Sequence, residues 1–224
     1  AGVGLSVAVN MMDNNTAAYA TNSDLTATGN ILLSADEQSD INSVSAALGI
    51  AKDGMAAAGA ATGNDLTNTT KAYISGKKTE DGGTTAHGNI SVAANDEADI
   101  LSIAGNLSVA KGKATGGGGL GVSASVTVTD NNVLAYIGSG SVVKAQGDDQ
   151  SAIAVYTGKR DDEGNKLTET MKGISVSATS FEDVISIAAG GSGAEKLAVQ
   201  GSAAVHVLDE TTKAYIDSGA RVAA

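Results

Sequence analysis

A short phrase ending in tyrosine recurs four times along the chain, and this repetition constrains the fold more than any other feature of the sequence. The phrase occupies residues 15–19, 69–73, 132–136 and 211–215, and each copy ends at its tyrosine: Tyr19, Tyr73, Tyr136 and Tyr215. The spacings between the tyrosines are 54, 63 and 79 residues. Self-similarity of this kind is the signature of a repeat architecture, in which each unit packs mainly against its neighbours. The sequence therefore predicts a stack of similar units.

A second motif aligns without gaps and marks the same units. It begins at an isoleucine and ends nine residues later at an aspartate: Ile31 to Asp40, Ile90 to Asp99, and Ile174 to Asp183. The units take up residues 1–54, 55–116 and 117–196, and a partial unit follows over 197–224. We treat them as one repetitive domain.

Within each unit, apolar and polar residues alternate with a period of two, which is typical of strands that bury one face. Val122 and Val126, for example, alternate with Ser123, Ser125 and Thr127. The chain has 29 glycines, no proline, no cysteine and a single phenylalanine, so small and β-branched side chains must fill its core in thin layers. We expect Val, Ile and Ala to point inward, and Ser, Thr and Asn to point outward.

Clusters of polar residues interrupt the apolar alternation and predict turns between strands. They include residues 13–15, 36–40 and 52–54. Alternating strands, regular turns and a repeat of about 54 residues favour an all-β fold, a parallel β-helix (β-solenoid), in which each unit forms two coils of about 27 residues. An antiparallel array of hairpins is the alternative, because long strands flank the turn at residues 52–54.

The extra length of the longer units falls at one corner of the predicted coil, in segments 77–87 and 147–172. The second insertion contains an apolar run, residues 152–156, followed by a charged stretch, residues 158–165. This pattern predicts a two-stranded hairpin that stands off the solenoid and adds little to its core. Insertions in solenoids often form the binding face, so Lys159 and Arg160 at the hairpin tip are candidate ligand contacts.

The charge balance excludes several classes of partner. The chain carries 14 basic and 25 acidic residues, a net charge of −11 with a pI near 4.4. Its only arginines are Arg160 and Arg221. Nucleic acids and anionic membranes both require clustered basic residues, so we expect neither as a partner. No apolar run reaches the ~18 residues that a membrane-spanning segment needs, so we also expect no membrane insertion.

The repeated units resemble those of leukotoxin-like filamentous adhesins, giant bacterial surface proteins akin to filamentous haemagglutinin. The resemblance rests on a Gly-rich strand, Asn-Asn or Thr-Thr, Lys/Ala-Ala-Tyr-Ile, and then Ile-Ser-Val-x-Ala. It covers nearly the whole chain except residues 147–172, and residues 55–65 depart from it by having Ala and Gly where other units have Val.

The resemblance implies a right-handed β-helix, export across an outer membrane by the two-partner (type V) route, and a place at the bacterial cell surface in adhesion or virulence. It further implies a non-catalytic stalk or adhesive segment of a secreted adhesin, without cofactors. The implied partners are a host receptor or glycan and the neighbouring repeats of the parent chain. Both ends fall inside the repeat pattern, so we expect the chain to be a segment of a longer one.

No catalytic residue is predicted. His87 and His206 have no Ser, Cys or carboxylate partner at a recognisable spacing, which argues against a catalytic triad or a zinc site. A β-helical polysaccharide-degrading enzyme is the alternative from another class, and it would require carboxylates or basic residues that converge on a groove. A ligand-free surface-layer or toxin scaffold is a third alternative.

Acidic residues cluster in the predicted turns at 36–40, 96–99 and 182–183. Calcium binds several such oxygens from one or two loops, but the calcium-binding nonapeptide and the EF-hand loop are absent. We therefore expect solvated corners of the solenoid and no metal site.

The tyrosines are the strongest candidates for a role beyond the scaffold. If Ala72 and Ile74 point inward, Tyr73 points outward, and the same reasoning applies to Tyr136 and Tyr215. A row of exposed aromatic rings could stack on sugar rings. Alternatively, each ring could cover a neighbouring coil or insertion.

Overall fold

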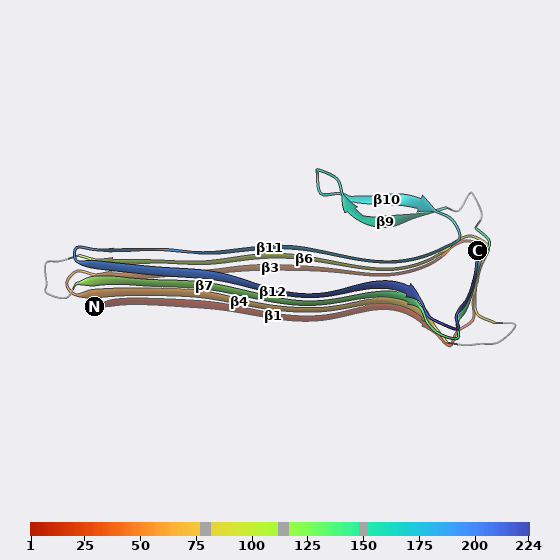
Figure 1. Cartoon of the computed structure of the whole chain (residues 1–224), viewed down its shortest axis with the longest axis horizontal. Coiled ribbons are helices and arrows are strands. Elements are labelled where there is room, and N and C mark those ends of the chain that lie inside the picture. The colour runs from red at the N-terminus through yellow and green to blue at the C-terminus, as the bar shows by residue number, and fades with distance from the viewer. Residues whose placement is uncertain (77–81, 112–116, 148–151) are drawn as a thin grey trace.

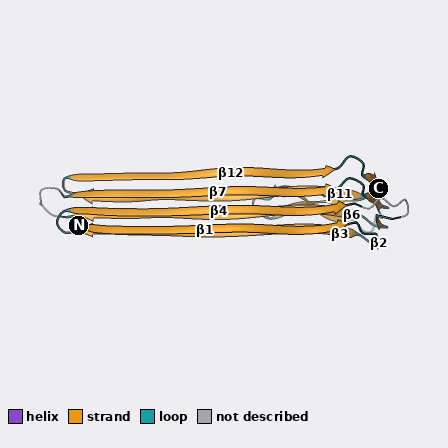
Figure 2. Ribbon diagram, turned by 90° about the horizontal axis from the view of Figure 1, so that it is seen from below, coloured by secondary structure: helices purple, strands orange, loops and turns teal. Residues whose placement is uncertain are grey.

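A computed structural model describes residues 1–76, 82–111, 117–147 and 152–224, and every regular element in these residues is a strand (Figure 2). The long strands are β1 (Gly2–Thr21), β3 (Ile31–Ala51), β4 (Met55–Ser75), β6 (Ile90–Ala110), β7 (Gly118–Ile137), β11 (Ile174–Ala194) and β12 (Leu197–Ile216). The short strands are β2 (Leu25–Ala27), β5 (Thr84–Ala86), β8 (Val142–Ala145), β9 (Ile153–Arg160), β10 (Lys166–Met171) and β13 (Arg221–Ala223).

The long strands form two parallel sheets, β1–β4–β7–β12 and β3–β6–β11, which lie face to face along the length of the molecule (Figure 1). A narrow parallel sheet, β2–β5–β8–β13, joins them at one end. Each coil runs along the first sheet, crosses the narrow sheet and returns along the second. The prediction of a parallel β-helix is confirmed, and the antiparallel alternative is wrong.

Both sequence motifs lie in register across the coils. Tyr19 pairs with Tyr73, Tyr73 with Tyr136 and Tyr136 with Tyr215. The second motif behaves in the same way, because Ile31, Ile90 and Ile174 are register partners. A whole repeat unit therefore makes one coil, and the prediction of two coils of about 27 residues per unit is wrong.

The prediction of two coils per unit fails because two of the three predicted turns lie inside strands. Residues 13–15 belong to β1 and residues 36–40 to β3, whereas residues 52–54 do turn and connect β3 to β4. Polar residues are tolerated within these strands because stacking places equivalent side chains side by side. Asn14 Nδ2, for example, donates to Asn68 Oδ1 of the next coil at 3.1 Å.

Over the half of the long strands nearest the turn at residues 52–54, the side chains face opposite to the prediction. Ser123, Ser125 and Thr127 are buried, whereas Val122 is 62% exposed and Val126 is 43% exposed. The expected inward ladder of Val side chains is therefore wrong in this half. The valines form the outer surface of the slab, and small polar residues form its interior.

The close approach of the two long sheets explains this reversal. A Cβ atom added at Gly4 in β1 would overlap the main-chain carbonyl of Leu48 in β3, and one added at Gly49 would overlap that of Ala57. Sheets that bury large side chains stand about 10 Å apart. This narrower interior accepts only Gly, Ala and small polar residues, so Val and Leu lie outside.

Hydrogen bonds within and between coils satisfy part of the polar interior, although the buried hydroxyls of Ser43, Ser45 and Ser108 have no partner among the described residues. The hydroxyl of Thr62 in β4 lies 2.7 Å from that of Ser102 in β6 and donates to Ser125 Oγ in β7 at 3.0 Å. Ser102 and Ser125 are 2.9 Å apart. Burial of these hydroxyls is tolerated because each finds a partner from another strand.

An apolar core forms at the opposite end, where the narrow sheet separates the two long ones. Its larger buried residues are Ile74, Ile90, Val92, Val133, Ile137 and Val143. Ala72 and Ile74 point inward as expected, which places Tyr73 on the outer face. The wider cross-section at this end explains why β-branched side chains fit inside here and not at the other end.

The second insertion contains the predicted hairpin, formed by antiparallel pairing of β9 and β10. It folds back over the β3–β6–β11 sheet, as Figure 1 shows. Ile153 and Val155 of β9 are buried on the side of the hairpin that meets the sheet, so the expectation that the hairpin stands off the solenoid is wrong. Neither residue joins the apolar core inside the coils, as expected. Residues 77–81 and 148–151 of the two insertions lie outside the described residues.

Candidate functional site

The tyrosine row, Tyr19, Tyr73, Tyr136 and Tyr215, runs across the outer face of the β1–β4–β7–β12 sheet. Successive ring centroids lie 5.4, 4.8 and 5.2 Å apart, and the rings are nearly parallel. Each ring therefore covers the ring of the next coil. Burial raises the pKa of Tyr136, and its tyrosine neighbours and Asp217 raise it further. The row offers a ligand the ring edges, the hydroxyl groups and the two outermost ring faces.

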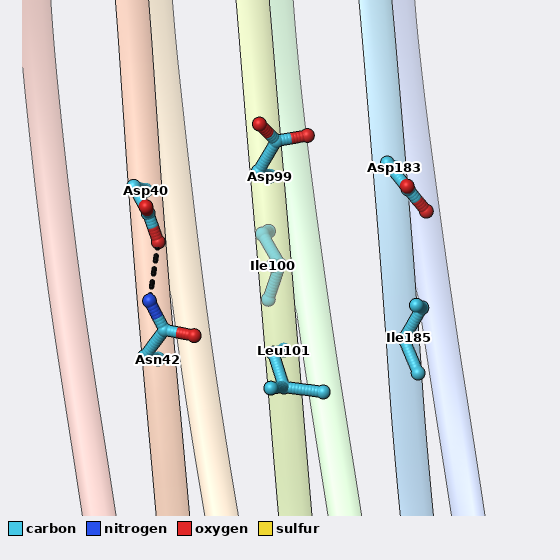
Figure 3. Close-up of a pocket in the computed structure, with 7 residues that line it drawn as sticks. All are labelled: Asp40, Asn42, Asp99, Ile100, Leu101, Asp183 and Ile185. Carbon is cyan, nitrogen blue, oxygen red and sulfur yellow. Dashed lines mark hydrogen bonds between the residues drawn. The ribbon is translucent and has the colours of Figure 1, made fainter. Parts of the chain in front are cut away.

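An acidic row, Asp40, Asp99 and Asp183, crosses the outer face of the β3–β6–β11 sheet (Figure 3). The three side chains line a shallow hollow of about 300 Å³ together with Asn42, Ile100, Leu101 and Ile185. Asn42 Nδ2 donates to Asp40 Oδ1 at 2.6 Å. Neighbouring strands in a sheet are about 4.8 Å apart, so three carboxylates stand side by side.

Asp99 stands at the centre of this row, between Asp40 and Asp183. Burial raises the pKa of Asp99, and the charges of Glu97, Asp183 and Asp40 raise it further, more than the charge of Arg160 lowers it. The sequence showed these residues in alignment but placed them in turns, so it did not identify the row as a site.

The hairpin binds the sheet beside the acidic row. Arg160 forms an ion pair with Glu97, the next outward residue of β6, and Lys166 Nζ lies 3.2 Å from Glu97 Oε2. The Arg160 guanidinium also lies 4.2 Å from the centre of the Phe181 ring. Of the two candidate contacts at the hairpin, Lys159 is exposed, whereas Arg160 is engaged with the sheet.

A cleft of about 270 Å³ lies between the hairpin and the sheet. Tyr156 and Lys166 line it on the hairpin side, and Leu32, Ser91 and Asn95 line it on the sheet side. The sequence suggested binding at this insertion, but it could not place the cleft because β9 and β10 are far from β3 in the chain.

The acidic clusters lie within strands and are not solvated corners of the solenoid. Because side chains alternate along a strand, the acidic residues of one cluster point to opposite faces of the sheet. Asp96 is 3% exposed, and it accepts hydrogen bonds from Asn68 Nδ2 at 3.3 Å and from Thr70 Oγ1 at 3.1 Å. Glu182 is only partly exposed and accepts from Asn131 Nδ2 at 2.6 Å. Burial is the main cause of the raised pKa of Asp96.

Within the described ranges, no group of three or more His, Asp or Glu side chains is arranged to hold a metal ion. His87 and His206 lie on different coils, at the narrow sheet and in β12 respectively. No helix in this part of the chain is long and apolar enough to cross a membrane.

The fold defines the chain as a parallel β-solenoid of stacked three-sided coils. Comparison with known proteins found no matching family model, no matching curated protein and no matching solved structure.

Proposed function

We propose that this chain is a structural stalk segment of a large secreted bacterial surface adhesin, and that it is not an enzyme. One observation carries the proposal: each complete coil adds one strand, in register, to each of the three parallel sheets. A stack of this kind grows by about 4.8 Å per coil without a new core, which suits a spacer. The resemblance to filamentous adhesins supports secretion by the two-partner route and a place at the cell surface.

The two ends of the stack support the same proposal. Strands β1 and β3 have an unpaired edge at one end, and β12 and β11 have one at the other. Leu208 and Ile216 point inward from β12, yet they are 58% and 51% exposed because the described part of the fourth coil has no strand in the β3–β6–β11 sheet. Long free edges are normally covered. We propose that neighbouring repeats of the parent chain cover them.

The cleft and the tyrosine row are the surfaces proposed for a host receptor or glycan. Sugars are recognised by aromatic rings together with amide and hydroxyl groups, and the cleft combines Tyr156 with Asn95 and Thr168. Insertions held on a rigid scaffold commonly carry recognition.

Added coils test the spacer role. Chains that carry two, four or eight extra copies of the second coil, residues 55–117, should stay folded. Their particles should lengthen by about 5 Å per coil in electron micrographs. Aggregation or unfolding after the first added coil would contradict the proposal.

Binding to a glycan array and to epithelial cells tests the adhesive role. Beads coated with the chain should bind, and Tyr156→Ala should reduce binding at least tenfold while leaving the melting temperature within about 2 °C. Tyr215→Ala makes the same substitution in the tyrosine row and tests that surface separately. If the chain bound no glycan and no cell, a ligand-free scaffold would be favoured.

A second candidate function rests on the acidic row. Register pairing puts Asp99 between Asp40 and Asp183 at the strand spacing of about 4.8 Å, and retaining glycosidases use a pair of carboxyl groups roughly 5 Å apart. Release of reducing ends from a panel of polysaccharides, abolished by Asp99→Asn, would favour an enzyme. Absence of that activity together with glycan binding would favour the adhesin.

A further inference from the structure

The outer surface of the β1–β4–β7–β12 sheet carries an apolar face that no part of the described chain covers. We define the apolar face as the four register rows that begin at Val3, Leu5, Val7 and Val9. These rows contain only Val, Leu, Ala and Gly. Val3, Leu5 and Val7 are each at least 70% exposed. Soluble monomers rarely expose a continuous apolar patch of this size, so the face points to an interaction.

We propose that the apolar face packs against the same face of a second copy of this chain, with the two solenoid axes parallel and pointing the same way. The expected area supports this partner. Four strands spaced at about 4.8 Å and a length of about 25 Å give roughly 500 Å² per copy. A pair therefore buries about 1,000 Å², which is near the lower limit for a specific interface, and each further coil enlarges it.

The position of the charges selects the arrangement of the two copies. Beyond the apolar face, the same sheet carries a row that includes Asp65, and then an acidic row of Asp13, Asp130 and Asp209 with Thr67. If the two axes ran in opposite directions with the strands parallel, these rows would lie against each other and repel. If instead the two solenoid axes are parallel, the strands of the two copies run antiparallel. The copies are then related by a two-fold axis that passes between Gly59 and Ala61, and the two acidic rows lie at opposite ends of the contact.

The opposite sheet is a poorer candidate for this contact. Its outer face also exposes Val44, Leu48 and Ile50. However, the β9–β10 hairpin projects from the other half of that sheet, where Arg160 and Lys166 contact Glu97, whereas no described residue stands over the β1–β4–β7–β12 sheet (Figure 1). The net charge of −11 also makes an anionic lipid surface a poor partner.

Sedimentation velocity over a range of protein concentrations tests the association. The wild-type chain should form dimers at micromolar concentrations, and Val122→Asp, in the centre of the apolar face, should weaken the dimer at least tenfold. Val44→Asp introduces the same charge on the opposite sheet and should leave the dimer intact. A wild-type chain that stayed monomeric at 100 µM, or a dimer sensitive to Val44→Asp and not to Val122→Asp, would overturn the proposal.

Single cysteines test the arrangement, because the natural chain has none. A short bismaleimide should link two copies of Ala61→Cys, which lies beside the two-fold axis. Thr67→Cys lies on the same strand and face, but its two copies would stand roughly 45 Å apart and should not be linked. Equal cross-linking at both positions would contradict the parallel arrangement.

Two other outcomes are separable from these. An association that survived Val122→Asp and linked neither cysteine would be end-to-end addition at the free strand edges, and it would overturn the proposal. Flotation of the wild-type chain with phosphatidylcholine vesicles, lost in Val122→Asp without any dimer in solution, would identify a lipid partner and overturn the proposal.

Discussion

Tyr73 and Tyr136 are 63 residues apart in the chain, yet their rings lie parallel with centroids 4.8 Å apart. The contact exists only because one complete coil separates the two residues and because every coil keeps the same register. It links the repeat that is visible in the sequence to the stacking that builds the solenoid.

The tyrosine row should stabilise the stack in proportion to the number of ring contacts. Tyr136 stacks on two rings and Tyr215 on one. At about 0.5–1.5 kcal/mol per aromatic pair, Tyr136→Ala should cost about twice as much stability as Tyr215→Ala. Chemical denaturation of both variants measures the difference. Equal losses would mean that the stacking contributes little.

The narrow interior should reject even a methyl group. Gly4→Ala would place a methyl group against the main chain of β3 and should destabilise the chain by about 1–3 kcal/mol or more. Gly63→Ala is the matched control, because its methyl group would point outward and meet only a Val9 methyl at 3.9 Å. The control should be neutral or slightly stabilising. Similar melting temperatures for the two variants would show that the sheets stand further apart.

Asp96 should make stability depend on pH. Its folded-state pKa is raised, so its contribution is fully present below the unfolded pKa of about 4 and is lost as pH rises through the folded pKa. Asp96→Asn cannot ionise and should therefore melt higher than the wild-type chain at pH 7, by roughly 2–4 °C. The difference should shrink at pH 4.

Asp53→Asn, in the exposed turn between β3 and β4, provides the comparison for the change in net charge. If Asp96→Asn lowered the melting temperature at pH 7, the ionised carboxylate would be a net stabilising group.

Glu97 should hold the hairpin in place. Burial opposes its ionisation, but Arg160 and Lys166 outweigh that effect and lower its pKa. The contribution of a group with a lowered pKa is present above the unfolded value of about 4.3 and is lost as pH falls through the folded value. The hairpin should therefore loosen in acid, and Glu97→Gln should loosen it at pH 7.

Trypsin reports this release, because Lys159, Arg160 and Lys166 lie in the hairpin strands. Cleavage there should be several times faster in Glu97→Gln, while the melting temperature changes little, since ion pairs near the surface contribute little stability. Glu163→Gln at the exposed tip should leave the cleavage rate unchanged. Equal rates in all three chains would mean that packing alone holds the hairpin.

The sequence predicted the class of fold because the two motifs identify residues that share a row, even though the tyrosines are 54, 63 and 79 residues apart. It did not predict which face of each strand lies inside. Alternation with a period of two shows which residues share a face of the strand, but not which face is buried. Only the hydrophobicity of Val122 assigned it to the interior. Val122 and Tyr136 are both even-numbered residues of one continuous strand, so they share a face. The turn predicted at residues 36–40 hid the same relation between Asp40 and Val44, which share a face of β3.

The candidate sites also divide into those that the sequence could predict and those that it could not. The tyrosine row could be predicted because each member carries the repeat. The contact of Arg160 with Glu97 could not, because it depends on how an insertion folds back over a coil formed more than 50 residues earlier. The polar interior left one signal in the sequence: Gly, Ala and Ser alternate with Val in the strands nearest the turn, a composition that suits closely spaced sheets.

The most direct test of the stacked coil is a disulfide between two of its turns. Thr69 and Asn132 are register partners on the outer face of β4 and β7, so their Cα atoms should lie about 4.8 Å apart, within the range that a disulfide spans. In the double variant Thr69→Cys, Asn132→Cys, mild oxidation of the dilute chain should close the bond in nearly every molecule, as mass spectrometry would measure. The pair Thr69→Cys, Ala124→Cys, shifted by eight residues or about 26 Å along the strand, should stay reduced. A bond in the shifted pair, or none in the first, would contradict one coil per repeat.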